Sequence, residues 1–85
     1  MALHSIALET PNDQVVERIK EHYPNFYRIN DVCWLVRSED VSSQVADKVG
    51  LGEPRLEGAT GAVMRLNGSH AGYATMSLWE WFINE

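Results

Sequence analysis

The stretch Asp31-Val32-Cys33-Trp34-Leu35-Val36-Arg37-Ser38 decides how the rest of the chain is arranged. Its run of five consecutive apolar or aromatic residues includes two β-branched valines and follows a turn-like Asn30-Asp31. A run this short, unbroken and rich in β-branched residues predicts a strand that is buried on both faces. Such a strand needs cover above and below, which the flanking segments must supply.

The residues before this strand predict a first strand and a helix. Apolar residues recur from Leu3 to Glu9, which is typical of a strand. A helix is predicted over about 11–23, with Thr10 as its N-cap, Pro11 in its first position and Pro24 at its end. The apolar face of this helix consists of Val15, Val16, Ile19 and Tyr23.

The central run belongs to a predicted hairpin that leads into a second helix. Residues 26–37 predict the hairpin, with Asn30-Asp31 as its tight turn. The second helix is predicted over about 39–49, with Ser38 as its N-cap and Gly50 as its C-terminal glycine.

The last third of the chain is less regular. The Gly, Pro and mixed charges of residues 51–60 predict a loop, and residues 61–66 predict a fourth strand. Residues 76–82 predict a short C-terminal helix, with an edge strand somewhere in 71–82 as the alternative.

The predicted order of strand, helix, strand, strand, helix, strand is that of the ferredoxin-like split βαβ (βαββαβ) fold, an α+β sandwich. Right-handed crossovers would place both helices on one face of a four-stranded antiparallel sheet, with the first and third strands at its centre. The other face would be bare in a monomer, so we expect cover from the same chain or from a second copy. The 85 residues predict a single domain over 1–85.

Composition restricts the partners and the location. The formal net charge is −5 and no Lys or Arg follows Arg65, so direct nucleic-acid binding is not expected. No apolar run approaches the roughly 20 residues that span a bilayer, and the N-terminus lacks the pattern of a signal peptide. Cys33 is the only cysteine, which excludes an intrachain disulfide and favours a cytoplasmic location.

Four short motifs occur together: Trp34-Leu35-Val36, residues 62–66 followed by Asn67-Gly68, Ala71-Gly72-Tyr73, and Leu78-Trp79-Glu80-Trp81-Phe82. This set resembles the small bacterial SinR-like proteins, which are related in fold to the ferredoxin-like CRISPR-associated adaptation subunit. The resemblance implies the same fold and, as in some members of the wider superfamily, homodimers formed through the sheets.

The resemblance also implies an alternative function, because other members of that superfamily are metal-dependent nucleases. They use an acidic residue at the end of the first strand, where the pattern has Asp and this chain has Glu9. Glu9 with Asp13 could help to hold a metal ion that activates water, although ordinary surface carboxylates explain both residues more simply. The departure from Asp argues against nuclease activity.

The remaining chemical candidates are weak. The three histidines, at 4, 22 and 70, are too dispersed for a zinc site, and Cys33 is expected to be an inert core residue. The loop at 67–73 could present backbone N–H groups and His70 to an anion, but a plain turn fits its Asn-Gly pair better. The sequence predicts no metal and no cofactor.

The function that this pattern predicts is a non-enzymatic protein-interaction or regulatory module that acts as a homodimer. The predicted partner-binding residues are His70, Tyr73, Trp79 and Trp81, since Trp and Tyr anchors dominate protein interfaces. An alternative is an acidic inhibitor that imitates nucleic acid and blocks a nucleic-acid-binding protein, such as one of bacterial defence. That alternative rests on Asp13, Glu17 and Glu21, which recur every four residues along one side of the first helix.

Overall fold

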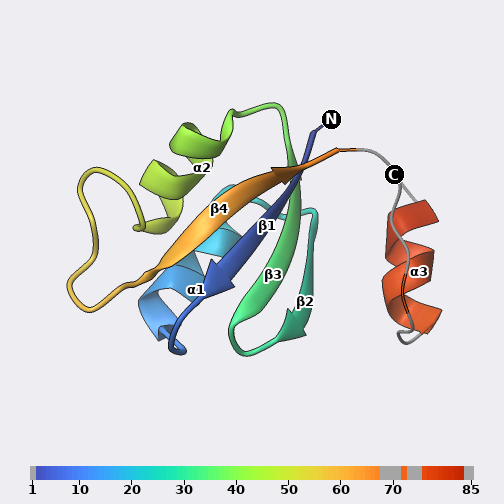
Figure 1. Cartoon of the computed structure of the whole chain (residues 1–85), viewed down its shortest axis with the longest axis horizontal. Coiled ribbons are helices and arrows are strands. Elements are labelled where there is room, and N and C mark those ends of the chain that lie inside the picture. The colour runs from blue at the N-terminus through green and yellow to red at the C-terminus, as the bar shows by residue number, and fades with distance from the viewer. Residues whose placement is uncertain (1, 68–71, 73–75, 84–85) are drawn as a thin grey trace.

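The computed structural model describes residues 2–67, 72 and 76–83, and within them the chain forms four strands and three helices (Figure 1). In chain order these elements are β1 (Ala2–Leu8), α1 (Asp13–His22), β2 (Phe26–Asn30), β3 (Cys33–Ser38), α2 (Ser42–Val49), β4 (Gly61–Leu66) and α3 (Met76–Ile83).

The four strands form one sheet with the order β2-β3-β1-β4, in which every neighbouring pair is antiparallel. The first and third strands therefore lie at the centre, as predicted. The protein is an α+β structure compatible with a ferredoxin-like fold.

The central run is buried along nearly its whole length. Every residue from Trp34 to Ser38 is buried, and only Cys33 at the start of β3 is partly exposed. The prediction of a strand covered on both faces is confirmed. Different helices cover the two faces of the sheet: α1 and α2 pack against one face, and α3 contacts the other.

A single hydrophobic core joins α1 and α2 to one face of the sheet. Alternate residues of the two central strands supply the sheet side of this core, as the two-residue period of a strand requires. Its members in regular elements include Ile6 and Leu8 of β1, Trp34 and Val36 of β3, Val15 and Ile19 of α1, and Val45 and Val49 of α2.

Helix α1 begins two residues later than predicted. The side chain of Asn12, not Thr10, caps it by accepting hydrogen bonds from the backbone N–H groups of Gln14 (3.0 Å) and Val15 (3.1 Å). The Asn12 side chain satisfies two N–H groups of the first turn at once, which explains why the helix starts after Asn12 and not after Thr10.

Helix α2 also begins later than predicted, at Ser42, because Ser38 stays in β3. The Ser38 hydroxyl accepts from the Asp40 N–H at 2.9 Å, and the Gln44 side chain accepts from the Val41 N–H at 3.0 Å. Gly50 ends the helix as predicted, with φ of 94°, a backbone conformation that residues with a Cβ rarely adopt.

The hairpin turn lies one residue further along than predicted. Asn30 is still part of β2 and pairs with Cys33, so Asp31 and Val32 form the turn. The Asn30 side chain accepts from the Val32 N–H at 2.9 Å, which favours this position of the turn.

The part of the C-terminal segment that the structure describes as a regular element is a helix and not an edge strand, since Met76–Ile83 forms α3. Figure 1 shows α3 at one end of the molecule, beside β2 and apart from α1 and α2. Among the described residues, no helix has the length and apolar character required to cross a membrane.

Candidate interaction surface

Arg37 connects α3 to the centre of the sheet. Its guanidinium donates to the backbone carbonyl oxygens of Trp81 (2.8 Å) and Phe82 (3.1 Å), and it lies 4.3 Å from the centre of the Trp81 ring. The carbonyls in the last turn of a helix lack partners within the helix and carry its partial negative charge. A cation that is 7% exposed and placed there satisfies two of these carbonyls and stacks on an indole.

A second set of contacts ties α3 to β2. The Tyr27 and Ser77 hydroxyls are 2.6 Å apart, and the Tyr27 and Trp81 rings pack with their centres 6.0 Å apart. The aromatic rings within α3 also contact one another, since Trp79 and Trp81 each pack against Phe82. Helix α3 is therefore held on the β2–β3 half of the sheet by a few polar and aromatic contacts.

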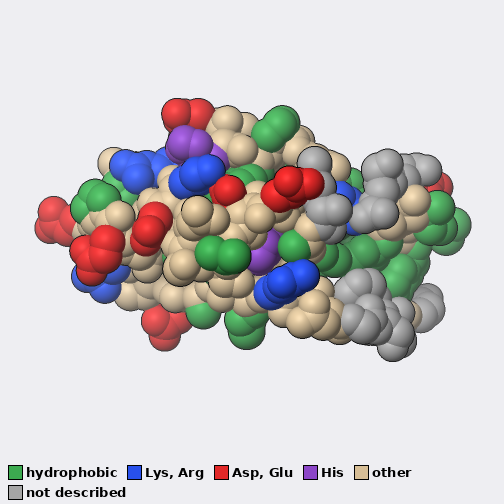
Figure 2. All heavy atoms as spheres, turned by 90° about the horizontal axis from the view of Figure 1, so that it is seen from above, with side chains coloured by type: hydrophobic (Ala, Val, Ile, Leu, Met, Phe, Trp, Pro, Cys, Tyr) green, Lys and Arg blue, Asp and Glu red, His purple; other side chains and the backbone are tan. Residues whose placement is uncertain are grey.

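Most of the apolar surface of α3 stays outside these contacts. Six of its eight residues are apolar, yet none is buried. Met76 is 71% exposed and Ile83 is 79% exposed, while Leu78, Trp79, Trp81 and Phe82 are each partly exposed. Figure 2 shows hydrophobic side chains gathered at the end of the molecule that carries α3. Monomeric proteins rarely expose large contiguous apolar patches, and such patches mark interaction sites.

The sheet face on the α3 side continues this apolar character. Residues directly opposite each other on antiparallel strands point to the same face, so the register defines the residues of this face. From β2 to β4 they are Tyr27 and Asn30, Cys33, Leu35 and Arg37, Leu3, Ser5 and Ala7, and Ala62, Met64 and Leu66. Arg37 is the only charged residue among them, and Met64 is 51% exposed. We call this face together with α3 the apolar surface.

The apolar surface contains half of the partner-binding residues that the sequence predicts. Trp79 and Trp81 lie on α3, where Trp81 stacks on Arg37 and Trp79 packs on Phe82. His70 and Tyr73 lie outside the described residues. The sequence does not single out Arg37 as a residue of this face, although the alternation of residues along β3 is a signal that could have identified it.

The predicted acidic row is an exposed feature of α1. Asp13, Glu17 and Glu21 are all exposed and line a shallow groove with Leu56 from the loop before β4. Arg18 lines the same groove and His22 lies 3.9 Å from Glu21, so the surface is not purely acidic. The inhibitor alternative stays a prediction.

The metal alternative gains no support from the geometry. Glu9 directly follows β1 and is exposed, and Asp13 begins α1. Within the described ranges, no group of three or more His, Cys, Asp or Glu side chains is arranged to hold a metal ion. The nuclease alternative stays a prediction that rests on the resemblance alone.

Cys33 lies at the start of β3 on the apolar surface and is partly exposed. Burial raises the pKa of its thiol above the ordinary cysteine value, which disfavours the thiolate. A low-pKa nucleophile is therefore absent at this position.

A cluster around Asp40 was missed by sequence reasoning. Its carboxylate accepts from the Tyr23 hydroxyl at 2.9 Å and from the Lys48 ammonium at 2.7 Å. The hydrogen bond from Lys48, followed by that from Tyr23, lowers the Asp40 carboxyl pKa from its ordinary value. Burial and the hydrogen bond to Asp40 raise the pKa of the Tyr23 hydroxyl. Asp40 thus joins the end of α1 to α2.

The same cluster explains why a histidine is buried in β1. His4 is 0% exposed, and its ring contacts the Asp40 carbonyl oxygen (3.0 Å) and the Ser42 hydroxyl (3.4 Å). A buried polar side chain needs such partners. Because His4, Tyr23, Asp40 and Lys48 are all engaged within the chain, we interpret the cluster as a structural tie between elements.

No protein-family model, curated protein or solved structure matches this chain. The resemblance to SinR-like proteins therefore stays a prediction based on the short motifs quoted above.

Proposed function

We propose that this protein is a non-enzymatic interaction module that acts as a homodimer, with the apolar surfaces of two copies packed against each other. The scaffold we propose for it is the ferredoxin-like βαββαβ fold. The observation that carries the proposal is α3, an apolar helix in which no residue is buried by its own chain.

The position of α3 supports a second copy as the occupant. Its contacts to Tyr27 and Arg37 cover the β2–β3 half of the sheet, while Ala62 and Met64 on β4 stay exposed. In a twofold dimer, α3 of one copy would lie over the β1–β4 half of the other, and the reciprocal contact would form at once. One apolar helix would then cover two half-faces.

The distribution of charge supports the same occupant. Two copies that each carry a net charge of −5 repel one another over most approaches. The sheet face of the apolar surface carries no carboxylate among its described residues, and Glu80 is the single acidic residue of α3 from Met76 to Ile83. The apolar surface is therefore the side on which two copies can meet with least repulsion.

Size adds a reason for association. A chain of 85 residues buries only about 60–65% of the surface that its unfolded form exposes, so the core of one copy provides modest stability. Covering the α3 aromatic rings in a dimer would remove further apolar area from water, and each Å² buried would stabilise the dimer by about 25 cal/mol.

Charge-introducing variants at the most exposed positions test the interface. Met76→Glu and Ile83→Glu together would place four carboxylates into a twofold interface, but should change the fold of a single copy little. We expect the dimer dissociation constant from sedimentation velocity to rise at least about thirtyfold, the effect of losing a hot spot of about 2 kcal/mol.

Val41→Glu is the matched control, because Val41 is also an exposed hydrophobic residue (57%) but precedes α2, away from the apolar surface. Its dissociation constant should equal that of the wild type. A double variant that dimerises as tightly as the wild type would contradict the proposed interface, as would an equal loss in Val41→Glu.

A further inference from the structure

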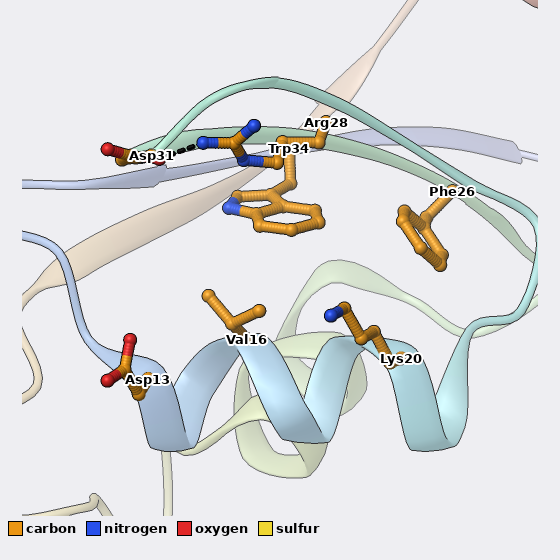
Figure 3. A pocket seen from close by; sticks show the side chains of 7 residues that line it. All are labelled: Asp13, Val16, Lys20, Phe26, Arg28, Asp31 and Trp34. Carbon is orange, nitrogen blue, oxygen red and sulfur yellow. Dashed lines mark hydrogen bonds and ion pairs between the residues drawn. The ribbon is translucent and has the colours of Figure 1, made fainter.

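A pocket of about 380 Å³ lies between α1 and the β2–β3 edge of the sheet, on the side opposite to the apolar surface (Figure 3). Its apolar walls are Val16 on α1, Phe26 on β2 and Trp34 on β3. The Phe26 and Trp34 rings pack with their centres 5.6 Å apart. The volume falls within the range of small-molecule sites.

Trp34 presents a polar atom without a partner in this pocket. The residue is 2% exposed, and its indole Nε1–H has no hydrogen-bond acceptor in the part of the chain that the structure describes. Figure 3 shows the nitrogen edge of the indole turned toward the end of the pocket that Asp13 and Asp31 form. Buried N–H groups are nearly always paired, so this one indicates an acceptor supplied from outside the chain.

Two charged groups from α1 border the same space. Lys20 and Asp13 line the pocket below the Trp34 indole, and neither forms an ion pair within the described residues. Arg28 and Asp31 also line the pocket but form an ion pair with each other. The pocket thus combines one available cation, one available carboxylate and one N–H donor, and its lining charges sum to zero.

We propose that this pocket binds a free α-amino acid with an apolar side chain. The ligand carboxylate would accept from the Lys20 ammonium and the Trp34 Nε1–H, and the ligand ammonium would pair with Asp13. The apolar side chain would pack against Val16 and Phe26. A cation and a carboxylate that border one pocket suit a zwitterion, whereas a polyphosphate or a divalent cation would leave Asp13 or Lys20 facing a like charge.

The Arg28–Asp31 pair controls access to the indole nitrogen. The nitrogen is shielded from solvent, while the Arg28 and Asp31 side chains beside it are 53% and 71% exposed. Exposed ion pairs contribute little to stability, so the pair can move aside at small cost when a ligand enters. Arg28 lies with its guanidinium carbon 6.0 Å from the centre of the Trp34 ring, and binding should disturb this contact.

Titration of the full chain with L-phenylalanine and L-leucine, followed by two-dimensional NMR, tests the proposal. We expect saturable binding that shifts the Trp34 indole N–H signal, assigned by comparison with Trp34→Phe. Two analogues each remove one charge: 3-phenylpropionate lacks the ammonium and phenethylamine lacks the carboxylate. Each should bind at least about tenfold more weakly, the effect of losing one charge-assisted hydrogen bond.

Variants of α1 assign the contacts. Lys20→Met and Asp13→Asn should each weaken L-phenylalanine binding about tenfold or more. Arg18→Met and Glu17→Gln are matched controls, because both residues lie on α1 but do not line this pocket. They should bind like the wild type.

Three results would overturn the proposal. The first is the absence of any shift of the Trp34 indole signal at millimolar amino acid. The second is equal affinity for L-phenylalanine and both analogues, which would show an apolar slot without recognition of the charges. The third is an equal loss of binding in the α1 variants and their controls.

Discussion

The two faces of the sheet are covered in different ways. On one face, α1 and α2 supply Val15, Ile19, Val45 and Val49, all of which are 0% exposed. On the other face, α3 supplies six apolar residues and none is buried. The first arrangement buries its apolar side chains completely, and the second leaves apolar side chains accessible to solvent or to a partner. Apolar composition by itself therefore does not indicate whether a helix completes a fold or serves an interface.

The largest expected difference between the two regions is the loss of stability when one isoleucine on each face is shortened to alanine. Ile6→Ala removes atoms from the buried core and leaves a cavity, so we expect the free energy of unfolding to fall by about 2–5 kcal/mol. Ile83→Ala changes an exposed side chain and should stay within about 0.5 kcal/mol. Urea denaturation at concentrations where the chain is monomeric measures both. Similar losses in the two variants would contradict the distinction.

Arg37→Met should release α3 from the sheet and leave the core intact. The variant loses two hydrogen bonds to helix carbonyls and the contact with Trp81, together worth about 1–3 kcal/mol. Hydrogen exchange should show faster exchange of α3 amides with unchanged protection in β1 and β3. Arg65→Met, at an exposed position on β4, is the control and should leave α3 protected. Uniform loss of protection in Arg37→Met would show that α3 belongs to the main cooperative unit.

The Asp40 cluster should make the core side of the molecule sensitive to acid. Because the Asp40 carboxyl pKa is lowered in the folded state, its contribution to stability is complete above the unfolded value of about 4. That contribution is lost as the pH falls through the lower folded value. Asp40→Asn should therefore flatten the acid side of the stability profile, measured by urea denaturation from pH 7 to pH 2. A profile as steep as that of the wild type would contradict the assignment.

The smallest expected effect is a change in the reaction rate of the Cys33 thiol, which is a local probe of the apolar surface. Because burial raises its thiol pKa, reaction with a thiol reagent should be slow at pH 7 and should accelerate as the pH rises. If copies pair through this face, the rate at a fixed pH should fall as the protein concentration increases. A rate that does not depend on concentration while the chain dimerises would place the interface elsewhere.

The sequence predicts the elements better than their ends or their contacts. The apolar run before Arg37 correctly indicates a central strand, and Gly50 correctly indicates a helix end. The starts of α1 and α2 were misplaced because several residues near each start can cap a helix, and only the folded backbone selects Asn12 over Thr10. The hydrogen bond between Tyr23 and Asp40 and the Arg37 contact with α3 join residues 17 to 45 positions apart, so local patterns carry no signal for them. The pocket beside Trp34 likewise arises from three separate elements.

The mass of the wild-type protein in solution tests the central claim most directly. Sedimentation equilibrium from micromolar to millimolar concentration should show a transition from 9.6 kDa toward twice that mass. A chain that keeps the mass of one copy throughout this range would contradict the homodimer and leave α3 as a surface for a different protein.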